Sequence, residues 1–249
     1  MNLKDLLLRM LPRGFRMALR RLRLKMISRR YRGLSAPEVF SKIYQQGAWG
    51  DSGDSAQPFY SGTGSHDAVT VDTYVAALTS FLNSMGGKST VLDVGCGDFN
   101  VGSRLREYCS SYLAADVVPS LIEYNRVKFA ALQVDFRVLD IISERAPAVD
   151  VIFIRQVLQH LSNSQIQSAI ANLRESCRFL VVTEHLPAGA GFQANLDKPA
   201  GPDIRSYIGS GVVLSLPPFS INAKSVRELC RVRDADGFIV TSVYEFSGG

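Results

Sequence analysis

The sequence of 249 residues has few cysteines, few histidines and a single tryptophan. The four cysteines form no C-x-x-C pair and no cysteine–histidine pattern with the spacing of metal ligands, which argues against a disulfide framework and a zinc site. The three histidines are too scattered in the sequence to indicate a metal cluster. We therefore expect a reduced, cytoplasmic protein with no bound metal. The residues concerned are Cys96, Cys109, Cys177, Cys230, His66, His160 and His185.

Long apolar runs are also absent, since no run reaches the roughly 18 residues that a membrane-spanning helix needs. The hydrophobic content is nevertheless 46%. A chain of this length and composition can bury the core of one large α/β domain.

Acidic residues are nearly missing from residues 1–35, where eleven Lys/Arg residues accompany Asp5 alone, a net charge of +10. The remaining chain carries −5, so the basic character belongs to this N-terminal extension. Its apolar residues fall on a helical spacing, which is typical of a basic amphipathic helix and unlike the uninterrupted apolar core of a signal peptide. Three interpretations stay open: a solvated extension, a helix that docks on the inner face of an anionic membrane, and a nucleic-acid-binding arm. The apolar positions are Leu3, Leu6, Leu7, Met10, Leu11, Phe15, Leu19 and Leu22.

The most informative segment is VLDVGCGDF, in which an apolar run ends in an acid and a glycine-rich turn follows. It predicts a buried parallel strand over 90–94 and a turn where a ligand approaches the backbone. Gly95 and Gly97 lack the Cβ that would block this approach, and either can adopt a positive φ. A helix is expected over 101–108, with its first N–H groups facing the ligand. A dinucleotide fingerprint would need a third glycine where Asn100 stands, which disfavours that class.

The D-x-G-x-G pattern that begins at Asp93 resembles motif I of the class I S-adenosylmethionine (SAM) methyltransferases. The resemblance implies an α/β fold, a Rossmann-like doubly wound and mostly parallel sheet of six or seven strands with helices on both faces, here with a basic N-terminal helical extension. It implies S-adenosyl-L-methionine as the cofactor. Upstream, a Tyr, Trp-Gly and S-G-x-G-S series resembles the N-terminal cap of a bacterial group of these enzymes. A cap over 36–88 and a SAM-binding domain over 89–249 are therefore expected.

Further strands that alternate with helical stretches indicate a parallel sheet. Ligands bind at the carboxyl ends of such strands, where Asp116 and Asp140 fall. An acid about 20 residues beyond the turn accepts hydrogen bonds from ribose hydroxyls, which is the expected role of Asp116. The family resemblance places Asp140 at the adenine amine and Ile141 against the adenine ring. The expected strands cover 112–116, 136–141, 149–154 and 179–183.

The resemblance implies a set of cofactor-binding residues in the cap, the glycine turn and the strand ends. The polar segment 45–65 is expected to order over the cofactor, because aromatic residues lie within it; a mobile loop is the alternative. Gln156 departs from relatives, which commonly carry aspartate there. The expected cofactor-binding residues are Trp49, Ser61, Gly62, Asp93, Gly95, Cys96, Gly97, Asp98, Asp116, Val117, Asp140, Ile141 and Gln156.

Methyl transfer to a hydroxyl is helped by a general base that takes the proton of the acceptor. His160, one turn beyond the fourth strand, is the first candidate, although it could instead pack or cap that helix. His185, beside Glu184 and just past the fifth strand, is the second. Arg155 and Arg205 are candidates to bind an anionic acceptor.

The sequence of the C-terminal region does not decide how many strands the sheet has. Residues 221–231 are expected to form a helix and 237–246 a strand. A seventh strand would have to come from 211–216, or the sheet has six. The Gly/Pro-rich insert 186–219 is expected to form a lid over the acceptor.

These patterns predict a SAM-dependent methyltransferase that acts on a small-molecule or glycan acceptor, with a hydroxyl as the favoured target and cell-envelope or polysaccharide synthesis as the favoured setting. An Asn/Asp-Pro-Pro-aromatic element is missing after the fourth strand, which disfavours methylation of exocyclic or amide nitrogens. Two alternatives stay open: an RNA methyltransferase that uses the basic N-terminus, and a non-catalytic SAM-binding interaction protein.

Overall fold

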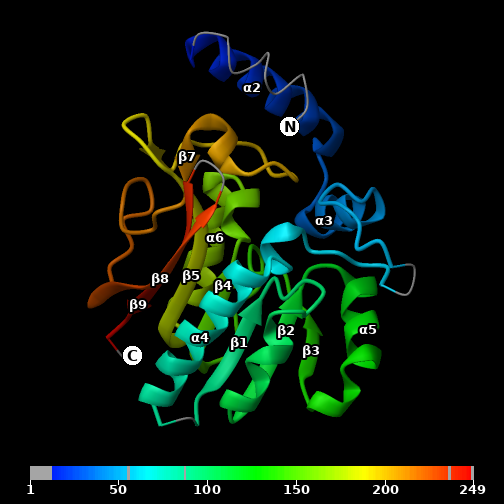
Figure 1. Cartoon of the computed structure of the whole chain (residues 1–249), viewed down its shortest axis with the longest axis vertical. Helices are drawn as coiled ribbons and strands as arrows, with labels where there is room; N and C mark the ends of the chain where they lie inside the picture. The colour runs from blue at the N-terminus through cyan, green and yellow to red at the C-terminus, as the bar shows by residue number, and fades with distance from the viewer. Residues whose placement is uncertain (1–12, 55–56, 87, 235–236, 248–249) are drawn as a thin grey trace.

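A computed structural model describes residues 13–54, 57–86, 88–234 and 237–247. Its centre is a seven-stranded sheet in the order β3-β2-β1-β4-β5-β9-β8, with helices on both faces (Figure 1). A second sheet pairs two short strands, β6 and β7. The strands are β1 (Thr90–Val94), β2 (Ser111–Asp116), β3 (Asp135–Val138), β4 (Val149–Arg155), β5 (Cys177–Pro187), β6 (Gln193–Ala194), β7 (Ser210–Gly211), β8 (Ser225–Asp234) and β9 (Gly237–Glu245).

The order of the strands creates a switch point beside β1. The first three strands run outward from β1 to β3, and the chain then returns so that β4 pairs on the other side of β1. Val91 is thus paired with Tyr112 of β2 and with Val151 of β4, both in parallel register. In an open α/β sheet, ligands bind in the crevice at the carboxyl ends of strands at such a point.

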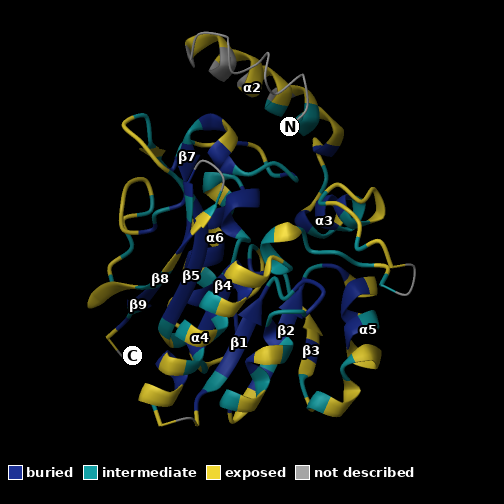
Figure 2. Cartoon of the chain, in the orientation of Figure 1, coloured by how far each residue is buried: buried dark blue, intermediate teal, exposed yellow. Residues whose placement is uncertain are grey.

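The helices cover the sheet on opposite sides. Buried residues of α4 pack with one face of β1, β4 and β5, whereas those of α3 and α6 pack with the other. The strands between them are buried, as the dark ribbon in Figure 2 shows. The helices are α2 (Arg13–Ser28), α3 (Ala36–Gln45), α4 (Ala68–Ser84), α5 (Pro119–Lys128) and α6 (Asn163–Leu173); short 3₁₀ turns cover Arg29–Tyr31, Thr63–Ser65, Gly102–Arg104, Arg106–Tyr108, Ala130–Leu132, Leu158–His160 and Arg205–Ile208.

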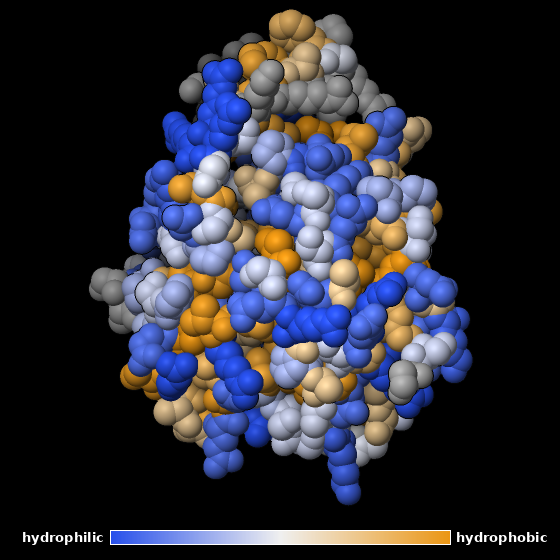
Figure 3. All heavy atoms as spheres, turned by 180° about the vertical axis from the view of Figure 1, so that it is seen from behind, coloured by the Kyte–Doolittle hydropathy of each residue, from blue (hydrophilic) through white to orange (hydrophobic). Residues whose placement is uncertain are grey.

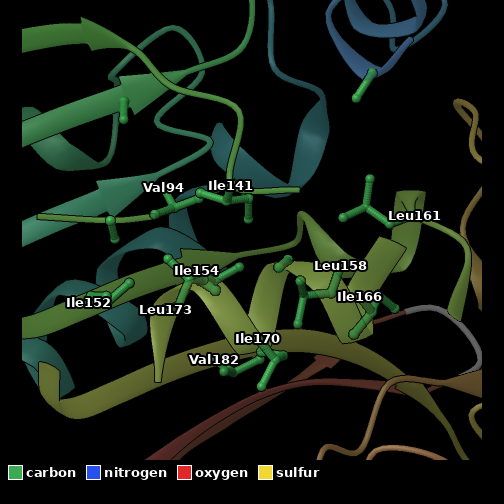
Figure 4. Close-up of a cluster of buried hydrophobic side chains, with 14 of the residues drawn as sticks. Val94, Ile141, Ile152, Ile154, Leu158, Leu161, Ile166, Ile170, Leu173 and Val182 are labelled. Carbon is green, nitrogen blue, oxygen red and sulfur yellow. The ribbon is translucent and has the colours of Figure 1, made fainter. Parts of the chain in front are cut away.

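Helix α6 shows how the sequence sets one of these contacts. Ser162 accepts a hydrogen bond from the Gln165 amide while the Gln165 side chain accepts one from the Ser162 amide, so the helix begins at a capping box. Ile166, Ile170 and Leu173 then recur on one face and are buried. Figure 4 shows this face packed on the side chains of β4 and β5.

The expected helix over 221–231 is wrong. Residues 225–234 form β8, which pairs antiparallel with β9 in register Val226↔Tyr244 and Val232↔Ile239. The apolar residues of this segment fit either period, and pairing with β9 selects the strand. Strand β8 is also the seventh strand, so the proposed strand over 211–216 is wrong as well. Residues 210–211 instead pair with β6.

Three smaller differences concern the strand ends and connections. Residues 101–108 form two 3₁₀ turns in place of the expected helix. Strand β3 stops at Val138, and residues 139–148 connect it to β4 without a helix. Strand β5 continues to Pro187, so His185 lies within the strand and not after it.

Parts of the N-terminal expectation lie outside the described residues, namely the helical spacing from Leu3 to Leu11. From Arg13 onward, α2 is a helix, as expected. None of the helices in the described part of the chain is long and apolar enough to cross a membrane.

Candidate functional site

A cavity of about 1030 Å³ opens at the carboxyl ends of β1, β2, β4 and β5. Residues of α2, α3 and the segment 61–65 form its other walls. Most of the residues expected to bind cofactor or acceptor lie in its lining. These are Trp49, Ser61, Gly62, Gly95, Cys96, Gly97, Asp116, Val117, Asp140, Ile141, Arg155, Gln156, His160 and His185.

The glycine turn after β1 is built for close approach to the backbone. Gly95 and Gly97 have φ of +70° and +55°, a region that other L-residues rarely adopt. A Cβ on Gly97 would lie 2.3 Å from Ser61 Oγ, and one on Gly95 would lie 2.4 Å from Val157 Cγ2. Only glycine therefore fits both positions.

Asp116, at the end of β2, lines the cavity, and two backbone amides hold its carboxylate in place. Its Oδ2 accepts a hydrogen bond from the Gly97 amide at 3.2 Å, and its Oδ1 accepts one from the Val118 amide at 3.1 Å. Burial raises the pKa of this carboxyl to about 6, against the lowering effect of the two amides. It is therefore a carboxylate at neutral pH, and its free lone pairs suit the hydroxyls of a ribose.

Asp93 and Asp98, also expected to bind cofactor, lie beneath the turn and do not line this cavity. Asp93 Oδ2 accepts a hydrogen bond from Tyr112 Oη at 3.0 Å, and burial raises the pKa of Asp93 to about 6. Asp98 Oδ2 accepts from the Ser61 amide at 3.0 Å and lies 2.7 Å from His66 Nε2. Asp93 is thus bonded to β2, whereas Asp98 links the glycine turn to the cap.

The segment over 45–65 covers the glycine turn, as expected, apart from residues 55–56, which are not described. Ser61 Oγ accepts a hydrogen bond from the Asp98 amide at 2.8 Å and lies 3.0 Å from Tyr44 Oη. The Trp49 indole donates to Pro202 O at 3.3 Å, and its ring lies 5.1 Å from that of Tyr44. The cap is thus tied both to the turn and to the insert after β5.

Arg155 holds the same cap from below. Its guanidinium donates to Gly64 O at 2.5 Å and to Ser65 Oγ at 3.2 Å, and stacks 5.1 Å from the Tyr74 ring centre. These contacts use one N–H of each Nη group for the chain itself. Arg155 also lines the cavity, and its expected binding of an anionic acceptor stays a prediction.

Arg205 does not reach the cavity at all. It is fully buried, and its guanidinium donates to Leu161 O at 2.7 Å and to Leu196 O. Arg205 was expected to contact the acceptor. In the structure it instead holds the insert 186–219 against the core. A sequence alone does not reveal whether an arginine in a loop is solvated or inserted.

Asp140 and Ile141 follow β3 at the edge of the cavity. Asp140 Oδ1 accepts a hydrogen bond from the Ile142 amide at 2.9 Å, and Ile141 is buried beside Val94 in the core cluster (Figure 4). With Val117, these residues give this side of the cavity an apolar wall and a carboxylate.

Gln156 occupies the turn after β4 in a left-handed conformation, with φ of +56°. Its backbone N–H donates a hydrogen bond to Thr183 O at 2.7 Å. A Cβ on Gly64 would lie 2.4 Å from Gln156 Oε1, so the cap loop packs directly on this side chain. An unusual backbone conformation at the floor of a cavity is a feature of ligand sites.

His160 is buried in an aromatic wall. Its Nδ1 lies 3.2 Å from Gly201 O, and its ring is 5.1 Å from that of Trp49 and 6.5 Å from that of Phe40. Burial, helped by the positive charge of Lys198, lowers the pKa of His160 to about 3. The ring is therefore neutral and a weak base near pH 7.

His185 lies across the cavity, on β5. Its Nε2 is 3.7 Å from Asp234 Oδ2 and has no hydrogen-bond partner among the described residues. Asp234, Asp203 and Tyr207 line the same side and were not predicted from the sequence. Asp234 is the last residue of β8 and lay in the connection between the expected helix 221–231 and the expected strand 237–246, so nothing in the sequence placed it at the site.

No group of three or more His, Cys, Asp or Glu side chains that could hold a metal occurs within the described ranges.

Comparison with known proteins agrees with this geometry. Residues 92–178 match a family model described as a methyltransferase domain. Two ubiquinone biosynthesis O-methyltransferases, from the M23 and Temecula1 / ATCC 700964 strains of Xylella fastidiosa, are each 26% identical to the chain over 133 residues. That match covers 51% of this chain and 50% of each relative, so the chain spans about half the length of the curated relatives it matches.

Solved structures share the fold over a larger part of the chain. DhpI in complex with SAH has a TM-score of 0.54 at 13% identity, and covers 84% of this chain and 97% of its own. The N-methyltransferase NodS of Bradyrhizobium japonicum WM9 with S-adenosyl-L-homocysteine gives 0.51 at 18% identity, with 72% and 88% covered. The magnesium protoporphyrin IX methyltransferase ChlM of Synechocystis PCC 6803 with bound SAM gives 0.50 at 14% identity, with 86% and 99% covered.

The seven-stranded sheet, with a glycine turn and the Asp116 carboxylate at its carboxyl edge, has a Rossmann-like architecture. The family match identifies residues 92–178 as a methyltransferase domain, and the sheet shares its fold with structures that hold SAM or SAH, so SAM is the cofactor against which the cavity can be tested. The residues present fit this cofactor, because the turn would reject a Cβ and Asp116 offers a buried carboxylate to the cavity.

Proposed function

We propose that the protein transfers the methyl group of SAM to a hydroxyl of a small-molecule or glycan acceptor, and that His185 is the general base. The observation that carries this proposal is the His185–Asp234 pair, which lines the same cavity as the glycine turn. The curated relatives are named as O-methyltransferases, which supports an oxygen acceptor.

SAM supplies a sulfonium methyl group that is already activated for transfer. The protein therefore has three tasks: to hold the cofactor, to exclude water and to align the acceptor. The glycine turn and Asp116 hold the ribose side, while Asp140 and Ile141 hold the adenine side. Trp49 and the cap segment close the cavity over them.

His185 completes the chemistry by accepting the proton of the acceptor hydroxyl at Nδ1, the nitrogen that does not face Asp234. The carboxylate of Asp234, 3.7 Å from Nε2, then stabilises the imidazolium. His160 is less suited to this task, since its pKa is lowered to about 3 and its Nδ1 already faces a carbonyl oxygen. Its flat ring forms part of the wall against which an acceptor lies.

The chemical character of the acceptor half favours a polyhydroxylated molecule. Its lining includes amides, carboxylates and one aromatic ring, which together offer hydrogen bonds and a stacking surface to a sugar. These residues are Gln156, Gln159, Asp203, Asp234 and Tyr207. The resemblance of the cap to that of bacterial sugar and cell-envelope enzymes points to the same class of acceptor.

The test has two stages. Calorimetric titration of SAM and S-adenosylhomocysteine into wild-type protein and Asp116→Ala establishes cofactor binding. Panels of sugars, glycolipids and phenols are then screened for methyl acceptance, with His185→Gln and His160→Gln compared on the acceptor found. We expect His185→Gln to lower kcat by about 10² to 10⁴-fold with unchanged SAM affinity, and His160→Gln to lower it far less. Equal turnover in His185→Gln and the wild type would reject His185 as the base.

A further inference from the structure

The outer face of helix α2 carries a row of exposed apolar side chains. Phe15, Leu19, Leu22 and Met26 are 55%, 36%, 53% and 54% exposed. Their spacing of four, three and four residues places all four on one face of the helix. Seen from behind, apolar surface gathers at the end of the molecule where α2 lies (Figure 3). We call these four residues the apolar stripe.

Helix α2 is attached to the body of the protein by other residues. Ile27 packs against the buried core cluster. Arg20 donates a hydrogen bond to Tyr207 O at 3.4 Å, and the Arg23 guanidinium lies 5.9 Å from the centre of the Tyr207 ring. The helix therefore lies across the insert after β5 while the apolar stripe stays exposed (Figures 1 and 2).

Charge distinguishes between the partners that such a face could meet. The sequence of α2 contains six Lys/Arg residues and no acid, and three further arginines follow between 29 and 32. The chain beyond residue 35 has a net charge of −5. A cationic helix with a continuous apolar face matches the surface of an anionic bilayer, which offers negative head groups above an apolar interior. Aliphatic side chains contribute little to RNA binding, and the apolar stripe contains a single aromatic ring, Phe15, on which a base could stack.

Helix α2 also lies at the wall of the cavity, so its exposed face and the site are neighbours. Arg23, Ile27 and Arg30 line the cavity, next to Asp203 and Tyr207. The helix thus forms part of the cavity wall as well as the exposed end of the molecule.

We propose that α2 docks the protein on the surface of an anionic lipid bilayer through the apolar stripe, with the adjacent opening of the cavity at the bilayer surface. If the methyltransferase function proposed above holds, the acceptor is then a molecule held in the bilayer, with its polar head group within reach of the cavity. Docking itself does not depend on that function, because it can be measured without SAM or acceptor.

Flotation of the full chain with vesicles tests the proposal. Vesicles of phosphatidylglycerol and phosphatidylcholine are compared with phosphatidylcholine alone, at low and at high salt. We expect binding to the anionic vesicles, weakened by salt. Leu19→Ser/Leu22→Ser should weaken it by about tenfold or more, because each substitution removes an apolar side chain from the interface. The matched control, Val69→Ser/Val127→Ser, changes two exposed valines on α4 and α5 and should bind like the wild type.

Hydrogen–deuterium exchange with and without anionic vesicles tests the orientation. We expect slower exchange over 13–31 and 203–208 and no change over Asp135–Val138, at the far edge of the sheet. The proposal would be overturned by no flotation, by equal flotation of the Leu19/Leu22 variant and the wild type, or by protection from exchange only at another surface. It would also be overturned if the wild type is a dimer and the Leu19/Leu22 variant a monomer, because the apolar stripe would then be the contact between two copies of the chain. Since SAM affinity is measured separately, failure of docking is distinguishable from failure of the proposed function.

Discussion

Gly97 meets two requirements at once, a positive φ and the absence of a side chain. A Cβ there would lie 2.3 Å from Ser61 Oγ, which also receives the hydrogen bond of the Asp98 amide. We expect Gly97→Ala to weaken SAM binding by at least about tenfold, since both the left-handed backbone and the turn–cap contact are disturbed. Gly53→Ala is the matched control, because Gly53 has φ of +74° and nothing within 4 Å of its Cβ position. Calorimetry on both variants distinguishes local strain from the loss of the contact; equal affinities would contradict the prediction.

Asp116 gives SAM binding a pH dependence. Its pKa is raised to about 6, so the carboxylate is present above that pH and is lost as the pH falls through it. Because the ionised form is the better acceptor for two ribose hydroxyls, we expect the Kd for SAM to rise below pH 6 by up to about tenfold per pH unit. Titrations between about pH 5 and pH 7.5, which span this pKa, check the prediction. Asp116→Asn should bind more weakly and without this dependence; a wild-type Kd that is constant over the range would refute the assignment.

Most of the residues expected to bind the cofactor line the cavity, whereas Arg205, expected at the acceptor, does not. The glycines and Asp116 belong to one continuous strand–turn pattern, so their place follows from local order. His185 was expected near the acceptor, but Asp234 lay in the connection after the expected helix 221–231, and Tyr207 in an insert without periodicity. Arg205 was misplaced because the burial of a charged loop residue depends on tertiary packing.

Arg155 is one of the side chains that hold the tip of the cap segment, together with Asn100, which donates to Ser65 O. We expect Arg155→Lys to speed hydrogen–deuterium exchange over 61–66 and to weaken SAM binding by about three- to tenfold, because an ammonium cannot reproduce the fork that reaches both Gly64 O and Ser65 Oγ. Arg104→Lys is the control, since Arg104 makes only an exposed ion pair with Asp72. Unaltered exchange in Arg155→Lys would show that the rest of the cap contacts suffice.

Among the elements, the five parallel strands were predicted from their apolar runs, and errors gathered where pairing or packing decides the outcome. Strand β8 is an exposed edge whose sequence suits two periods, and its conformation depends on β9. The 3₁₀ turns over 102–108 replace a helix because the chain returns to the sheet after two short turns. Such effects depend on contacts that are remote in sequence.

Glu184 should make the molecule lose stability as the pH rises from acid toward neutral, whereas His160, with a pKa lowered from 6.5 to about 3, acts in the opposite direction below pH 6.5. Burial raises the pKa of Glu184 to about 8, from 4.5, despite the opposing effects of Arg205 and Lys198; Tyr244 lies nearby. A raised carboxyl pKa means that the folded state binds the proton more tightly, so this stabilisation is complete below the unfolded value and is lost as the pH rises toward 8. Over pH 6 to 7 we expect the free energy of unfolding to fall by up to ~1.4 kcal/mol per pH unit.

Glu184→Gln is the matched variant, because it keeps the shape and removes the titration. Asp93 and Asp116, with pKa values of about 6, act in the same direction at lower pH, whereas Lys198, with a pKa lowered to about 7, acts in the opposite direction above it. Urea denaturation at several pH values between 6 and 7 isolates the contribution of Glu184 in this range. If the free energy of unfolding depended on pH in the same way in Glu184→Gln and the wild type, the contribution assigned to Glu184 would be rejected.

The chain contains one tryptophan, and that residue stands in the wall of the cavity, 5.1 Å from the rings of both Tyr44 and His160. Its indole therefore gives the protein a built-in optical signal whose emission comes wholly from the site. Ligands that enter the cavity, or variants that loosen the cap, should alter the intensity and wavelength of that emission. Candidate acceptors can accordingly be ranked by fluorescence titration of the unlabelled protein, before any product has been identified.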